Sequence, residues 1–183
     1  MSPEEAPKQP AGVPGHSQAV DAADVAAAVT AVWNLMLDGS VVCGDANEAE
    51  AEADSETAGQ IVGSIAFAGD LRGVVEIRLA EPVAAAITAA LTGEPIASAS
   101  ALAVDAIGEL LNLIAGQLKA GLDLAGARLG TPCVDRFDAL PPDAAPPVLF
   151  ASPGDGPAPP PGRMACRSPL GALEVAYDIR RAA

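Results

Sequence analysis

Residues 60–80 read QIVGSIAFAGDLRGVVEIRLA and carry the clearest structural signal in the chain. Apolar residues alternate with other residues on both sides of the centre, which is the period of a strand with one buried face. These positions are Ile61, Gly63, Ile65 and Phe67 before the centre, and Val75, Ile77 and Leu79 after it. The central GDLRG, residues 69–73, supplies turn residues. The stretch therefore predicts a β-hairpin, and with it an antiparallel sheet.

The flanking segments predict helices and further strands around this hairpin. Apolar residues at three- and four-residue steps predict long helices over 21–38 and 98–125 and a shorter helix over 82–91. Gly39 is expected to end the helix over 21–38, and Gly93 is expected to end the helix over 82–91. Strands are expected at 40–43, 131–138, 146–152 and 172–181. Because strands follow one another along the chain, the order favours an α+β fold, an antiparallel β-sheet with packed helices, over a doubly wound parallel one.

Three segments are expected to lie outside the packed elements of a single domain over residues 20–183. Residues 1–19 are rich in Pro, Gly, Glu and Gln, so we expect a disordered N-terminal tail. Residues 45–58 are acidic without apolar periodicity and predict a solvated loop. Residues 152–163 are rich in Pro and Gly and predict a second loop.

Composition excludes several classes of partner. The formal net charge of −14 repels phosphate backbones and anionic lipids, so we expect no nucleic acid and no membrane among the partners. No run of about 18 residues is both apolar and free of charge, and so no membrane span is predicted. The N-terminal sequence lacks the basic and apolar regions of a secretory signal, which favours a cytoplasmic protein.

Cysteine and histidine usage argues against a metal site. Cys43, Cys133 and Cys166 are far apart in sequence and form no CxxC pair, so we expect free thiols in a reducing cytoplasm. The sole histidine, His16, falls in the expected tail, which argues against histidine-based catalysis and histidine-ligated zinc. The acidic stretch lacks a rigid turn pattern, and we predict no metal ligands in this chain.

The long helix has an unusual polar face. At about 100° per residue, Asp105, Glu109, Asn112 and Gly116 fall within about 60° of one another, opposite the apolar residues of the helix. Gly108 lies beside them. A solvated face would explain the polar residues, but each glycine costs roughly 1 kcal/mol relative to alanine in a helix interior. Small residues on this face admit the close approach of another surface, which favours a docking face.

These residues, with the hairpin before them and LGTPCV after them, resemble the CheX chemotaxis phosphatase family, related to CheC and FliY. The family motif places an Asp or Ser, a Glu, an Asn and a distant Pro at the positions of Asp105, Glu109, Asn112 and Pro132. The resemblance runs from about residue 21 to the C-terminus and is tightest over 67–134. Only one copy of the motif is present, as in CheX, whereas CheC has two.

The resemblance implies a phosphatase that removes the phosphoryl group from the aspartate of a phosphorylated CheY-type response regulator, in chemotaxis or related two-component signalling. It implies that Asn112 and Glu109 are catalytic: Asn112 orients the attacking water, and Glu109 pairs with the regulator's lysine. Gly108 and Gly116 would let the helix approach the regulator, and Asp105 would either contact it or cap the helix. No cofactor is expected on this chain, with Mg²⁺ on the regulator instead. A homodimer is also implied, for which the edge strands of the sheet offer a surface.

Two other functions remain open from the sequence. The same fold could bind a response regulator or a motor-switch protein without turning over phosphate. A third hypothesis is a dimerisation domain whose function lies in assembly. The presence of both Glu109 and Asn112 favours the enzyme.

Overall fold

The computed structural model describes residues 19–37, 39–45, 59–96, 101–137 and 162–182. Within them the chain forms three helices and seven strands. The helices are α1 (Ala22–Met36), α2 (Glu81–Thr92) and α3 (Ala101–Gly121). The strands are β1 (Val42–Asp45), β2 (Gln60–Ala68), β3 (Leu71–Ala80), β4 (Arg128–Leu129), β5 (Cys133–Phe137), β6 (Gly162–Ser168) and β7 (Gly171–Arg181).

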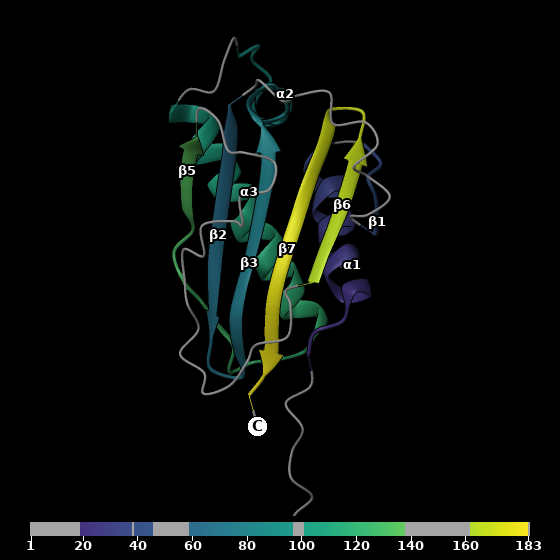
Figure 1. Cartoon of the computed structure of the whole chain (residues 1–183), viewed down its shortest axis with the longest axis vertical. Coiled ribbons are helices and arrows are strands. Elements are labelled where there is room, and N and C mark those ends of the chain that lie inside the picture. The colour runs from purple at the N-terminus through teal and green to yellow at the C-terminus, as the bar shows by residue number, and fades with distance from the viewer. Residues whose placement is uncertain (1–18, 38, 46–58, 97–100, 138–161, 183) are drawn as a thin grey trace, which may run out of the picture.

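The described strands form one antiparallel sheet, which confirms the predicted fold class (Figure 1). Its order is β1-β6-β7-β3-β2-β4, and β5 also pairs with β2. The predicted hairpin is β2–β3, with Ile65 opposite Val75. Its turn is only two residues long, and Gly69 adopts a φ of 87°, a conformation that glycine reaches without the clash of a Cβ atom. The rest of GDLRG belongs to β3.

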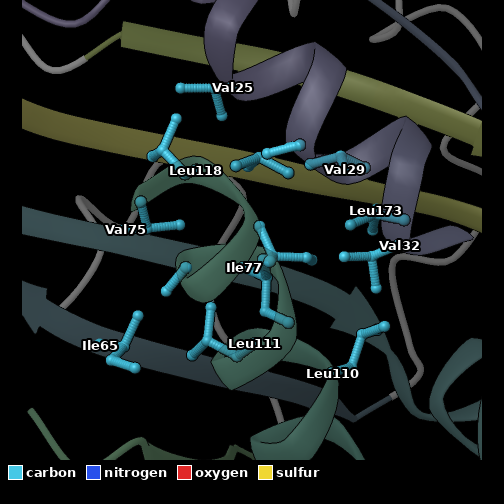
Figure 2. Close-up of a cluster of buried hydrophobic side chains, with 14 of the residues drawn as sticks. Val25, Val29, Val32, Ile65, Val75, Ile77, Leu110, Leu111, Leu118 and Leu173 are labelled. Atoms are coloured by element: carbon cyan, nitrogen blue, oxygen red, sulfur yellow. The ribbon is translucent and has the colours of Figure 1, made fainter. Parts of the chain in front are cut away.

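The core lies between one face of the sheet and the helices. Figure 2 shows side chains of α1, α3 and the central strands meeting there, including Val29, Leu111 and Ile77. These three side chains are fully buried. Burying one side chain of this size stabilises the fold by about 1.5–3 kcal/mol. The strongest restraint on α3 is therefore its apolar side, which fixes the direction in which the opposite side faces.

The residues at the ends of α1 and α2 mostly have the roles that the sequence predicts. Asp21 caps α1 by accepting a hydrogen bond from the Ala23 N–H at 3.2 Å. The helix ends at Met36, before the predicted stop at Gly39. α2 has Pro82 in its first turn and ends at Thr92, with Gly93 as its C-cap at a φ of 74°.

Sequence patterns missed part or all of two of the described strands. The prediction of a Pro/Gly-rich loop over 152–163 is wrong at its end, because β6 begins at Gly162. Met164 and Cys166 of β6 face the core and are buried, but such a short alternation is a weak signal beside so many prolines. The two-residue β4 was also missed. The predicted strand over 146–152, the tail over 1–18 and the acidic loop over 46–58 lie outside the described residues, and Asp45 belongs to β1.

The prediction of three free thiols is wrong for two of them. Cys43 and Cys166 form a disulfide, and only Cys133 is free. The two bonded cysteines are 123 residues apart in sequence, but they are direct register partners in the β1–β6 pair. The pairing of β1 with β6 brings these two cysteines together although they are far apart in the sequence.

The long helix α3 is the one described helix that is long and apolar enough to cross a membrane, with 21 residues and a mean hydropathy of 1.4 over its best window. Its apolar side packs in the core, where Ile107, Leu111 and Ile114 are fully buried. Its other side carries charged and polar residues. α3 therefore has the features of the core helix of a folded domain.

Candidate functional site

The predicted stripe lies on the solvent side of α3. Asp105, Glu109 and Asn112 are exposed, and Gly116 is half-buried. The opposite side of the helix is buried and consists of Ile107, Leu110, Leu111, Ile114 and Leu118. The helix wheel drawn from the sequence therefore separates the two sides correctly. We call Asp105, Glu109, Asn112 and Gly116 the α3 stripe.

Neighbouring elements hold α3 on both flanks. It packs against α1, α2, β2 and β5, so its backbone is fixed along most of its length. A side chain on such an element keeps its position better than one on a loop. The α3 stripe can therefore present Glu109 and Asn112, three residues apart on one face, at a defined spacing.

The two glycines have different surroundings. A Cβ atom added to Gly116 would meet nothing within 4 Å, so the space above it is open. A Cβ atom at Gly108 would lie 3.6 Å from Val134 Cγ2 and 3.9 Å from Pro132 Cβ. Gly108 thus lies at the contact between α3 and the start of β5. The same contact places Pro132, the last residue of the family motif, beside the helix.

Asp105 does not cap the helix. α3 begins at Ala101 and has no acidic residue in its first turn, so Asp105 belongs to the second turn. A capping side chain accepts from the first free N–H groups and stands at the residue before the helix. The position therefore argues against a capping role for Asp105, and its contact with a partner stays a prediction.

Sequence reasoning missed two apolar residues beside the stripe. Leu113 is 38% exposed and Leu102 is 47% exposed, although most leucines of α3 are buried. Both project at about 60–80° from Asp105 on the helix wheel, next to Glu109. The helix wheel could have predicted their exposure, because it places both leucines on the polar side of an amphipathic helix. The stripe is thus bordered by apolar surface on this side.

The chemistry available to the stripe is limited. Asn112 has a neutral carboxamide that can donate and accept hydrogen bonds but is a poor nucleophile. Among the described residues no group of three His, Cys, Asp or Glu side chains could hold a metal ion. A cavity of about 330 Å³ lies elsewhere, between the start of α1 and the strands β1 and β6. An exposed stripe of this kind can position groups in a site that belongs to another molecule.

Comparison with known proteins matches the segment of the chain that contains the stripe. A family profile described as "Chemotaxis phosphatase CheX" matches residues 61–143, a segment that includes the whole stripe and Pro132. This segment of the chain is therefore similar to the CheX family. No curated protein sequence matches the chain at a significant level.

Solved structures extend the CheX-like fold over most of the chain. The chemotaxis protein CheX from Vibrio vulnificus aligns with a TM-score of 0.65 at 18% identity, covering 86% of this chain and 95% of that one. CheX from Desulfovibrio desulfuricans aligns with a TM-score of 0.63 at 19% identity, covering 85% and 96%. The CheX–CheY–BeF3–Mg complex from Borrelia burgdorferi gives a TM-score of 0.57 at 14% identity, covering 87% and 96%. The fold is therefore shared well beyond the segment that the family profile matches.

Proposed function

We propose that this CheX-like chain hydrolyses the aspartyl phosphate of a CheY-type response regulator. The observation that carries the proposal is the exposed α3 stripe, with Glu109 and Asn112 on the free side of a helix whose other side is fixed in the core. The family description as a chemotaxis phosphatase and the CheX–CheY complex from Borrelia burgdorferi support it.

Asn112 is suited to orient the attacking water. An acyl phosphate is already reactive, so a catalyst gains most by holding water in line with phosphorus. The carboxamide can accept a hydrogen bond from the water and donate one to a phosphoryl oxygen. Water then forms the new P–O bond while the bond to the aspartate oxygen breaks. Mg²⁺, expected on the regulator, would neutralise charge on the phosphoryl oxygens.

Glu109 is suited to hold the two proteins in register. It lies one helical turn before Asn112 and is exposed, so its carboxylate can pair with the regulator's lysine. One charge-assisted contact is worth about 1.5–3 kcal/mol. Asp105, a turn earlier, extends the same line of contacts, and the open space at Gly116 lets the partner approach the backbone.

The test is the release of phosphate from a purified, phosphorylated CheY-type regulator with Mg²⁺ in the buffer. The proposal expects this chain to accelerate the release, and Gln117→Ala to leave the rate unchanged. Gln117 is a matched control because it is exposed on the same helix but lies off the stripe. A chain that binds the phosphorylated regulator without accelerating the loss of phosphate would be a binding module instead, and one that did neither would contradict both functions.

We also propose that the chain forms a homodimer through the β1 edge of the sheet. Among the described strands β1 pairs only with β6, which leaves its other side unpaired. Val42 of this strand is 72% exposed, and Leu35 and Met36 at the end of α1 are exposed as well. Unpaired strand edges and exposed apolar side chains are the features from which subunits pair. A cytoplasmic location stays a prediction.

A further inference from the structure

The disulfide between Cys43 and Cys166 joins the edge strand β1 to the body of the sheet. Figure 1 shows β1 at the margin, next to β6 and beside α1. The four residues of β1 pair with β6 alone among the described strands. The covalent bond is therefore the strongest link between this strand and its neighbour.

The two bonded cysteine residues differ in exposure. Cys166 is fully buried, whereas Cys43 is half-buried and lines the cavity of about 330 Å³ at the start of α1. Thiol–disulfide exchange requires a thiolate to reach one of the two sulfur atoms, so access decides which sulfur is attacked. The lining residues of this cavity include Cys43, Gly44 and Met164 but not Cys166.

The cavity also has a charged group suited to a small anionic ligand. Its size falls at the lower end of small-molecule sites, which are about 300–1,000 Å³. Arg163 lines it, and the side chain of Arg163 remains 43% exposed although one of its nitrogens lies 3.3 Å from Glu174 Oε1. A guanidinium group has five N–H donors, so this ion pair leaves donors for a carboxylate.

We propose that Cys43 is a thiol-exchange site for low-molecular-weight thiols that carry a carboxylate, with Arg163 holding that carboxylate. The thiolate sulfur bonds to Cys43 Sγ while the bond from Cys43 to Cys166 breaks. Cys166 leaves as a thiolate and takes up a proton from water, so one thiol is consumed and one is formed. A second thiol then releases Cys43 and leaves as a disulfide of the small molecule. β1 is thereafter held to β6 by pairing alone, which makes its attachment dependent on the thiol pool.

The experiment uses the full chain with Cys133→Ser, because Cys133 is a free and partly exposed thiol that would react by itself. The protein is first denatured and alkylated without reductant, which must show Cys43 and Cys166 protected. The folded protein is then exposed to glutathione without oxygen, quenched with acid, and mapped by mass spectrometry. Glutathione is expected on Cys43 at least tenfold more often than on Cys166. Alkylation of both cysteines in the first step, or equal adducts in the second, would overturn the proposal.

A second comparison tests the role of Arg163. Arg163→Gln is expected to slow exchange with glutathione severalfold while leaving exchange with cysteamine, a cationic thiol, unchanged. Arg167→Gln is the matched control, since Arg167 is exposed on the same strand but does not line the cavity. Equal slowing for the two thiols, no slowing for either, or the same effect from Arg167→Gln would overturn the assignment of Arg163. Circular dichroism verifies that each variant is folded.

Discussion

At the scale of single residues, Gly116 shows a conflict between stability and docking. Glycine in a helix interior costs about 1 kcal/mol relative to alanine, and the open space at Gly116 gives a new methyl group nothing to clash with. Gly116→Ala should therefore raise the free energy of unfolding by about 1 kcal/mol, measured by urea denaturation. If the stripe docks on a regulator, the same change should raise KM, because the methyl group separates the two surfaces. A more stable protein with an unchanged KM would show that no partner approaches this position.

Glu76 provides a second residue-scale prediction, on the sheet face opposite the helices. Burial of its carboxyl raises its pKa above the usual value near 4.5, although Arg78 acts in the opposite direction. The folded state therefore holds a proton that the unfolded state releases, so the stability contributed by this group falls as pH rises from about 4.5 through the raised pKa. Glu76→Gln should remove this dependence and gain stability relative to the parent as pH rises across that window. Urea denaturation of both proteins at several pH values measures the difference, and a constant difference would contradict the expected titration.

At the scale of elements, the sequence predicted what depends on neighbouring residues. The β2–β3 hairpin follows from two alternating runs joined by a glycine-containing turn, and all its pairing is local. The two sides of α3 follow from one helical period. The Cys43–Cys166 bond depends instead on a sheet order that no local pattern contains. The strand β6 forms a local hairpin with β7, but its short alternation is a weak signal directly after a Pro- and Gly-rich stretch. The stripe was predicted for the same reason as α3, but the contact of Gly108 with Pro132 and Val134 needed the packing of β5 against the helix.

Leu113 gives the element-scale prediction, because it tests whether the whole face of α3 takes part in docking. Its exposed side chain follows Asn112 in the chain and borders the stripe, so a partner that reaches Asn112 should cover it. Leu113→Ser should raise KM for the phosphorylated regulator by roughly tenfold, as expected for the loss of about 1.5 kcal/mol of apolar burial, and leave kcat unchanged. Ala27→Ser is the control, since Ala27 is exposed on α1, outside this face and outside the proposed dimer surface. A fall in kcat without a change in KM would place Leu113 in the chemistry rather than in docking.

At the scale of the whole molecule, the two proposed interactions use separate surfaces, one face of a helix and one edge of the sheet. In the proposed functions, the α3 stripe would contact a regulator, and the β1 edge would contact a second copy of the chain. Light scattering at tens of micromolar should return twice the monomer mass of 18.1 kDa. Val42→Lys should return the monomer mass, because a lysine on an edge strand opposes pairing. Ala125→Lys, at an exposed site after α3, should leave the dimer intact. A monomeric parent would contradict the proposed assembly without affecting the proposed chemistry.

The central claim is that Asn112 orients the water that attacks the aspartyl phosphate, and one rate constant tests it most directly. The measurement is the first-order loss of phosphate from a phosphorylated CheY-type regulator, with Mg²⁺ present and this chain at saturating concentration. Asn112→Ala should lower the accelerated rate on the order of a hundredfold. The fold should remain intact, since the site is exposed and alanine is the better helix former. An Asn112→Ala protein that dephosphorylates the regulator as fast as the parent would contradict the mechanism.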